Sequence, residues 1–261
     1  MTAPDKGAQP HNTVSLRFMN RYTGAMQFDA PLIPATLVRR YKRFLADCQL
    51  ADGQEITAHV ANPGSMLGMK EPGTKVWLEP NDNPKRKLKF AWRLSETASG
   101  DFIGVDTGVP NKMLKAALMA GSVPGLTGYD AVRPEMKYGE NSRIDFLLTG
   151  QGRRDAWVEV KSVTLSRQNG LAEFPDSVTA RGTKHLGELS KLAQDGQRAV
   201  MLYLVQRTDC REMTLASDID QAYAQAFSIA TGNGVEVLCF DCKLSPEGVE
   251  LGRAIPFKAP N

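Results

Sequence analysis

Short runs of alternating hydrophobic and polar residues fill the first part of the chain, and clusters of turn-forming residues separate them. Between Pro31 and Val105 the runs are interrupted by turn signals such as Asp52-Gly53 and Pro72-Gly73. Short strands at regular spacing, with turns between them, are typical of a small β-barrel or β-sandwich. The predicted strands are 43–50, 55–60, 75–79, 88–94 and 102–105.

After Asn111 the hydrophobic residues recur at helical spacing, and this first predicted helix ends at Gly121. Strand-like and helical segments then alternate to the end of the chain. Such alternation indicates an α/β domain with a mixed sheet. The predicted strands are 144–148, 156–160, 200–205 and 235–240, and the later predicted helices lie around 186–192 and over 219–231.

The change of period predicts two domains joined near residues 105–111. Residues 31–105 form the small barrel, and residues 106–261 form the mixed α/β domain. Residues 1–30 develop no periodicity and contain several helix-breaking residues, so we expect a flexible tail there.

The composition is that of an ordinary globular protein, with 42% hydrophobic and 23% charged residues. No apolar run approaches the roughly 20 residues that a membrane span needs. Four cysteines in 261 residues are too few for a disulfide scaffold. We therefore expect a cytoplasmic protein with no membrane partner.

The formal net charge of +3 comes entirely from the first part of the chain. Residues 1–110 carry 14 Lys and Arg against 11 Asp and Glu, whereas residues 111–261 carry 18 of each. Aromatic residues interleave with the basic ones, a pattern suited to phosphate contact and base stacking. We predict salt-dependent, weakly selective contacts to nucleic acid, with ordinary solvated loops as the alternative. The predicted contact residues are Arg39, Arg40, Lys42, Arg43, Lys85, Arg86 and Lys87.

Asp145 stands inside one apolar strand, and Glu159 and Lys161 stand in the next. Glu159 and Lys161 share a face, because strand side chains alternate. Burying two carboxylates and an ammonium is costly unless they are paired or bind metal. Carboxylate oxygens suit Mg²⁺, which would hold a phosphodiester and lower the pKa of a bound water, while Lys161 stabilises charge on the phosphorus. This is the Asp…Glu-x-Lys arrangement of the PD-(D/E)xK nucleases, and Glu135 is a further candidate metal ligand just before the first of these strands.

A buried salt-bridged network without catalysis is the alternative interpretation of these residues. The helix that follows carries Arg181, His185 and Glu188 at spacing i, i+4 and i+7, so they share one face. Arg181 is a candidate phosphate contact, and His185 is a candidate hydrogen-bond partner of the substrate or of a metal-bound water. A solvated polar face is the alternative for this helix.

Several long and unusual strings in the chain point to a known family. The strings are ATLVRRYKRFLAD (35–47), NPGSM (62–66), DNPKRK (82–87), EMKYG (135–139), SRIDF (142–146), VEVKSVTL (158–165), FPD (174–176) and RGTKHL (181–186). Over residues 28–256 the chain resembles the sugar fermentation stimulation protein A family. The family's pattern begins at about Met26, so we interpret residues 1–25 as a lineage-specific tail or the product of a misassigned start codon.

The resemblance implies an N-terminal OB-type barrel followed by a C-terminal restriction-endonuclease-like α/β domain with a mixed sheet. It implies DNA binding with little sequence preference and a regulatory link to sugar (maltose) metabolism. The metal-site residues carry over to Asp145, Glu159 and Lys161, with Glu135 added, and none of the first three departs from the family pattern.

We therefore expect a cytoplasmic regulator that binds duplex DNA and retains a nuclease site dependent on Mg²⁺ or Mn²⁺. Arg181 and His185 would contact the bound DNA near that site. Two alternatives stay open: a DNA-binding regulator whose nuclease domain is vestigial and does not cleave, and an RNA-processing nuclease.

Overall fold

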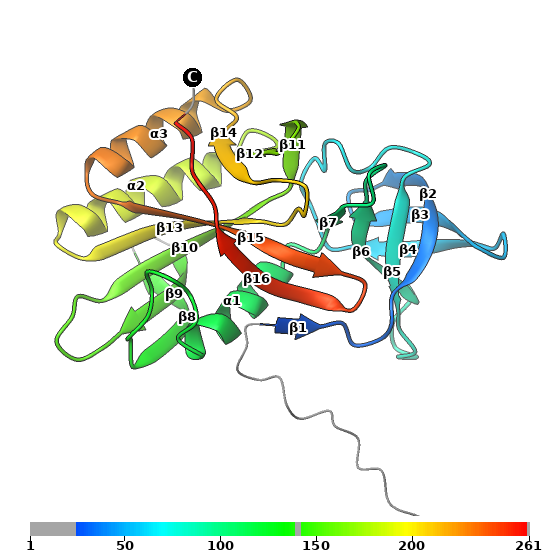
Figure 1. The fold of residues 1–261 in the computed structure, drawn as a ribbon, viewed down its shortest axis with the longest axis horizontal. Helices are drawn as coiled ribbons and strands as arrows, with labels where there is room; N and C mark the ends of the chain where they lie inside the picture. Colours follow the sequence, from blue (N-terminus) through cyan, green and yellow to red (C-terminus); the bar gives the residue numbers. More distant parts are fainter. Residues whose placement is uncertain (1–24, 139–141, 260–261) are drawn as a thin grey trace, which may run out of the picture.

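The structure is a computed structural model that describes residues 25–138 and 142–259. A β-barrel and an α/β domain lie side by side, with the barrel at the right and the α/β domain at the left of Figure 1. This is the mixed α/β architecture that the sequence predicts. Among the described residues, no helix is long and apolar enough to cross a membrane.

The barrel is a curved, mainly antiparallel sheet that closes on itself. Its strand order is β4-β3-β2-β5-β6-β7, and a parallel pairing of β4 with β6 closes it. Trp92, Leu37 and Met66 lie buried inside. The strands are β2 (Ile33–Tyr41), β3 (Leu45–Leu50), β4 (Glu55–Val60), β5 (Lys75–Pro80), β6 (Phe90–Glu96) and β7 (Phe102–Gly104).

We did not predict strand β2, and this strand contains part of one basic cluster. We predicted that Arg39 and Arg40 precede the first strand of the barrel, but they lie inside β2, and Lys42 and Arg43 form the turn to β3. The sequence pattern does not reveal β2, because Pro34 and the two arginines near the end of the strand interrupt the alternation of apolar and polar residues.

The α/β domain is built on a mixed sheet with helices on both faces. Its strand order is β1-β16-β15-β13-β10-β9-β8, and β13 pairs in parallel with both β10 and β15. A smaller sheet has the order β11-β12-β14. The elements are β1 (Ala25–Gln27), α1 (Val109–Met119), β8 (Ala131–Tyr138), β9 (Ser142–Thr149), β10 (Ala156–Val163), β11 (Leu165–Gln168), β12 (Leu171–Phe174), α2 (Ala180–Gln194), β13 (Arg198–Val205), β14 (Glu212–Leu215), α3 (Gln221–Gly232), β15 (Glu236–Ser245) and β16 (Gly248–Ala254).

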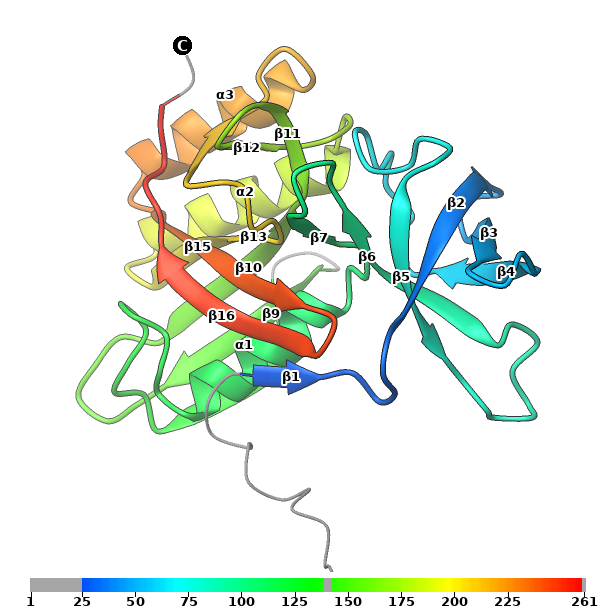
Figure 2. The same ribbon diagram turned by 45° about the vertical axis from the view of Figure 1, so that its right-hand side comes forward.

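The two faces of the large sheet pack against different helices. On one face, Met113 of α1 belongs to the same buried cluster as Val158 of β10. On the other face, Leu186 of α2 packs with Tyr203 of β13, and α3 covers the same cluster. Figure 2 shows α2 and α3 together on that side. Because strand side chains alternate, Glu159 of β10 faces α2.

Strand β1 corrects the predicted extent of the tail. Met26 pairs with Val249 of β16, so the range 1–30 that we predicted as a flexible tail contains a strand of the large sheet. The pairing is favourable because it satisfies backbone groups that an edge strand would otherwise expose. Residues 1–24 of the predicted tail lie outside the described residues.

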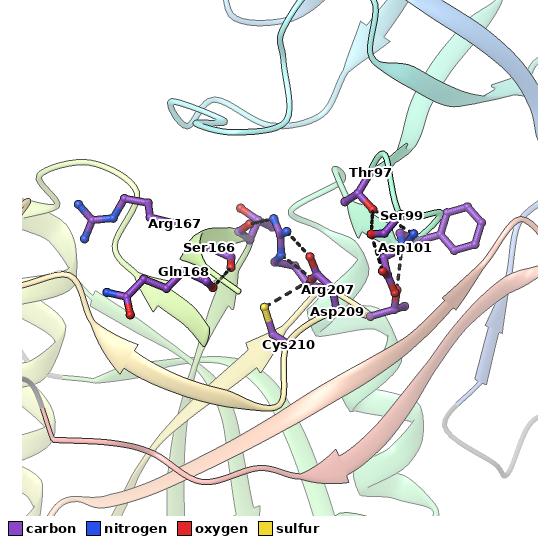
Figure 3. Close-up of polar contacts among 12 residues, drawn as sticks. Thr97, Ser99, Asp101, Ser166, Arg167, Gln168, Arg207, Asp209 and Cys210 are labelled. Atoms are coloured by element: carbon purple, nitrogen blue, oxygen red, sulfur yellow. Dashed lines mark hydrogen bonds and ion pairs between the residues drawn. The ribbon is translucent and has the colours of Figure 1, made fainter. Parts of the chain in front are cut away.

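Hydrogen bonds between the end of the barrel and the loop after β13 join the two domains. The Oγ1 of Thr208 donates to Asp101 Oδ1 at 3.0 Å and accepts from the backbone N–H of Phe102 at 2.9 Å. Ile103 forms a β-bridge with Arg207, which lies near Asp101 at this junction (Figure 3). The barrel is therefore fixed to the α/β domain just before the predicted hinge at residues 105–111.

Candidate active site

Asp145 and Glu159 occupy facing positions at the point where β9 and β10 separate. The two strands pair as far as Phe146 and Val158, and the next position on each strand is a carboxylate. Asp145 Oδ2 accepts a hydrogen bond from the backbone N–H of Val160 at 2.8 Å. If β9 and β10 continued to pair, a backbone group of β9 would accept this bond. Here the Asp145 side chain accepts it instead.

Helix α1 holds the other oxygen of Asp145. The Asn111 amide Nδ2 donates to Asp145 Oδ1 at 2.7 Å. Burial, followed by the negative charge of Glu159, raises the pKa of Asp145 to about 6. The charge of Glu159 thus disfavours ionisation of Asp145, and a bound cation would offset that effect.

Glu159 lies in a buried network with Lys161 and His185, which the sequence had placed on adjoining elements. Its Oε1 accepts from Lys161 Nζ at 2.7 Å and contacts His185 Nδ1 of α2. Burial favours a raised pKa at Glu159, but the hydrogen bond from His185 and the charge of Lys161 outweigh it and hold the pKa below its ordinary value.

Helix α2 continues this network outward. Its N-terminus is capped by Thr179, whose side chain accepts from the N–H of Gly182. Arg181 Nε donates to His185 Nε2 at 3.4 Å, while His185 Nδ1 faces Glu159 Oε1 and Lys161 Nζ. The structure therefore brings both α2 residues of the prediction together with Glu159.

Glu135 lies just before β9, as predicted, but inside β8, a strand that we did not predict. It falls between Pro134 and Met136, whose partners on β9 flank Asp145, so its backbone position lies across from Asp145. Its φ of 55° is left-handed and its side chain is exposed. Among the described residues, no group of three or more His, Cys, Asp or Glu side chains is arranged to hold a metal. The role of Glu135 as a ligand stays a prediction.

The donor set of Asp145 and Glu159 fits a divalent cation. Glu159 is 3% exposed, and its Oε2 is buried with no hydrogen-bond partner within the described part of the chain. A buried, unpartnered carboxylate oxygen is unfavourable unless a cation or donor satisfies it. Mg²⁺ is commonly bound through one or two carboxylates and completes its shell with water.

The basic residues of β2 and its turn have different surroundings. Arg39 is exposed and pairs with Asp47 at 2.8 Å. Arg40 instead donates from Nη2 to the backbone oxygens of Asn62 and Gly64, at 2.8 and 3.1 Å, and so braces the loop after β4. Arg40 is thus part of the barrel's own structure.

The turn and the β5–β6 loop present further cations. Lys42 and Arg43 are exposed, and both have a left-handed φ. The exposed residues of the β5–β6 loop include Lys85, Arg86 and Lys87.

A cleft of about 490 Å³ connects this loop with the α/β domain. Lys112 of α1 is among its lining residues, and it directly follows Asn111, the partner of Asp145. Sequence reasoning missed both of these α1 residues, because polar residues in a first helical turn carry no distinguishing signal. The residues that line the cleft include His59, Arg86, Lys87, Phe90, Arg93 and Lys112.

The chain matches two family models that cover most of its length. The model described as the SfsA N-terminal OB domain matches residues 38–105, and the model described as the sugar fermentation stimulation protein RE domain matches residues 108–248. This chain belongs to the sugar fermentation stimulation protein family. The match confirms the predicted family and the OB-type barrel.

Relatives of similar length share most of the sequence. The sugar fermentation stimulation protein homolog of Ruegeria pomeroyi is 65% identical over 226 residues, covering 87% of this chain and 98% of the relative. The homolog of Roseobacter denitrificans is 64% identical over 234 residues, covering 89% and 100%. The solved structure of Pyrococcus furiosus SfsA in complex with Ca²⁺ superposes with a TM-score of 0.80 at 24% identity, covering 89% of this chain and 98% of that one. It shares the fold of this chain.

Proposed function

We propose that this protein binds DNA with little sequence preference and cleaves it at a metal-dependent site formed by Asp145, Glu159 and Lys161. The observation that carries the proposal is the facing pair of carboxylates at the separation of β9 and β10, with a lysine hydrogen-bonded to one of them. This combination is suited to phosphodiester hydrolysis. We place the protein in the cytoplasm and take duplex DNA as its substrate.

A divalent cation, Mg²⁺ or Mn²⁺, held by Asp145 and Glu159 would polarise the phosphodiester and lower the pKa of a bound water. Asp145 is oriented for this role before any ligand arrives, because Val160 and Asn111 hold its two oxygens. Lys161 would stabilise the negative charge that builds on the phosphoryl oxygens.

Two further residues support the site. His185 fixes Glu159 through Nδ1, and such supporting hydrogen bonds orient metal ligands. Glu135 is proposed as an additional ligand from the neighbouring strand β8. The Pyrococcus furiosus relative is described in complex with Ca²⁺, a cation that also prefers oxygen ligands, and this supports the assignment.

DNA would reach the site along the basic cleft between the barrel and α1. Arg86, Lys87 and Lys112 line that cleft, and Phe90 offers a ring beside them. Lysines and arginines that follow a backbone, with an aromatic residue between them, suit weakly selective binding that weakens with salt. Arg181, exposed at the start of α2, would contact a phosphate beside the carboxylates.

A second candidate function is DNA binding without cleavage. Glu159 Oε1 is already engaged by both Lys161 and His185, so this part of the site is a closed ion-pair network in the structure. Such a network can serve stability alone. In that case the α/β domain is a scaffold for a DNA-binding regulator, and the family name is the support for its link to sugar metabolism.

The decisive experiment incubates the purified protein with linear duplex DNA in EDTA, Mg²⁺ or Mn²⁺. We expect cleavage with either metal, and its loss in Asp145→Ala and Lys161→Ala. Asp52→Ala, an exposed carboxylate in a barrel turn, is the matched control and should cleave normally. Binding without cleavage in both metals would leave the scaffold function. Competition among duplex DNA, single-stranded DNA and RNA at fixed salt tests the RNA-processing alternative.

A further inference from the structure

We propose that the turn between β2 and β3 stacks on an unpaired base, so that the preferred substrate is DNA in which a duplex ends in unpaired nucleotides. The inference rests on the proposed function, because it names the class of DNA that the same protein binds. Tyr41 of β2 pairs with Leu45 of β3, and the three residues between them are Lys42, Arg43 and Phe44. We call these three residues the cationic turn.

The cationic turn places an aromatic ring and two cations at the surface. Phe44 is 47% exposed, although a phenyl ring gains free energy when it leaves water. Lys42 and Arg43 are exposed, and within the part of the chain that the structure describes neither side chain forms an ion pair. Arg39, by contrast, is paired with Asp47. A free ring beside two unpaired cations complements the base and the phosphates of a nucleotide.

The backbone of the cationic turn has a conformation that its residues disfavour. Lys42 has a φ of 47° and Arg43 has a φ of 61°. A left-handed φ brings Cβ close to a carbonyl oxygen, so glycine and asparagine adopt it more readily than lysine or arginine. Strained positions of this kind cluster at sites that bind ligands. The turn therefore keeps two long cationic side chains where a neutral pair would be less strained.

Arg40 and β4 hold the cationic turn in place. Arg40 Nη2 donates to the backbone oxygen of Arg43 at 2.8 Å and to that of Asn62, in the loop after β4, at 2.8 Å. The backbone N–H of Val60 donates to the backbone oxygen of Phe44 at 2.8 Å. Hydrogen bonds therefore fix both ends of the Arg43–Phe44 segment against the end of β4.

The end of β4 forms part of the basic cleft between the barrel and α1. Val60 lies between His59 and Ala61, and both of these residues line the cleft. Lys112 lines the same cleft from α1, and the residue before it is hydrogen-bonded to Asp145. The cationic turn thus lies beside the path proposed for DNA. A duplex that occupies this path can bring its unpaired end to Phe44 while the paired part lies toward α1.

Stacking on the cationic turn selects unpaired nucleotides. Inside a duplex, both faces of each base are covered by the neighbouring bases, so an exposed ring finds no free face to contact. An unpaired nucleotide has a free face and can rotate toward the ring of Phe44. Every base has such a face, so the contact tolerates any sequence. Lys42 and Arg43 would bind the phosphates on either side of the stacked nucleotide.

The experiment compares two fluorescent forked duplexes, titrated with the full chain in EDTA at fixed salt. In the first, both strands continue past one end of the duplex as four unpaired thymidines. In the second, abasic nucleotides replace these thymidines, so the phosphates are the same and only the bases are missing. We expect the thymidine fork to bind about fivefold or more tightly than the abasic fork, because stacking of a base on an aromatic ring contributes at least this much.

Substitutions of Phe44 test the ring itself. Phe44→Ala should abolish the difference in affinity between the two forks, and Phe44→Trp should keep it, because an indole also stacks on a base. Ile229→Ala is the matched control. It removes a side chain of α3 that is 63% exposed, and it should leave the difference unchanged.

A double variant, Lys42→Asn with Arg43→Gly, tests the two cations. Its residues adopt a left-handed φ readily, so resistance to unfolding by urea should not fall. The affinity for both forks should fall, and the slope of log K against log salt should decrease by about two units. An unchanged slope would show that the turn contacts no phosphate.

Equal affinities of the wild type for the two forks, or an unchanged difference in Phe44→Ala, would overturn the stacking role. These measurements need no metal and no cleavage, so they are independent of the nuclease test. Cleavage of duplex DNA without a difference between the forks leaves the proposed function intact and removes the present inference. A difference between the forks without cleavage removes the nuclease proposal and retains the inference.

Discussion

Asp176 of the α/β domain accepts hydrogen bonds from Ser65 of the barrel, a residue 111 positions away along the chain. Its Oδ2 accepts from Ser65 Oγ at 3.0 Å and from the backbone N–H of Met66 at 3.1 Å. Asp176 lies just before α2, the helix that carries His185. The contact therefore couples a barrel loop to the start of the helix that supports Glu159.

Asp176→Ala should weaken the joint between the domains. The variant loses both hydrogen bonds that the carboxylate accepts from the barrel and a third from Ser177, so we expect the free energy of unfolding to fall by about 1–3 kcal/mol. Urea unfolding measures the change. Ser65→Ala removes one of the two bonds and should cost less. Equal stabilities of Asp176→Ala and the wild type would show that the joint contributes nothing.

Arg40 and Arg39 should contribute differently to the stability of the protein. Arg40→Ala removes the guanidinium that braces the carbonyls of Asn62 and Gly64, and we expect a loss of about 1–3 kcal/mol in stability. Arg39→Ala removes an exposed ion pair and should change stability by less than about 1 kcal/mol. Thermal and urea unfolding of the two variants, side by side, test this difference. An equally small effect of both would contradict the bracing role.

Lys112 and Lys115 provide a matched pair on α1. Lys112 lines the basic cleft, whereas Lys115 is an exposed lysine outside that lining. Lys112→Ala should weaken binding of duplex DNA and reduce the slope of log K against log salt by about one unit. Lys115→Ala should leave the slope unchanged. Fluorescence titrations at four salt concentrations measure both, and equal slopes for the two variants would exclude the cleft as the DNA path.

The metal-free protein should lose stability as the pH rises through the titration of Asp145. Burial and the charge of Glu159 raise its pKa to about 6, above the ordinary value of about 4. The folded protein therefore holds this proton more tightly than the unfolded chain does. The resulting stability is fully present below about pH 4 and is lost as the pH passes 6.

Asp145→Asn provides the comparison, because an amide does not ionise in this range. Between pH 4 and pH 7 in EDTA, the wild type should lose about 2–3 kcal/mol of stability relative to the variant. Urea unfolding at pH 4, 5, 6 and 7 measures the difference. A constant difference across this range would mean that Asp145 titrates normally.

Local patterns in the sequence were sufficient for most of the elements and for part of the site. The shared face of Glu159 and Lys161 follows from the two-residue period of a strand, and the shared face of Arg181 and His185 follows from the helical period. The predicted helix over 219–231 lies within two residues of α3. Each of these depends on neighbours along the chain, which periodicity describes directly.

The tertiary structure determined which residues of distant segments lie opposite each other. The facing positions of Asp145 and Glu159, the bond from Asn111, the pairing of β1 with β16 and the joint at Asp176 all link distant segments. Strand register and helix docking set these contacts, and both depend on the packing of the whole core rather than on local spacing. The sequence by itself therefore determined which residues are candidates for the site, and the fold determined how they meet.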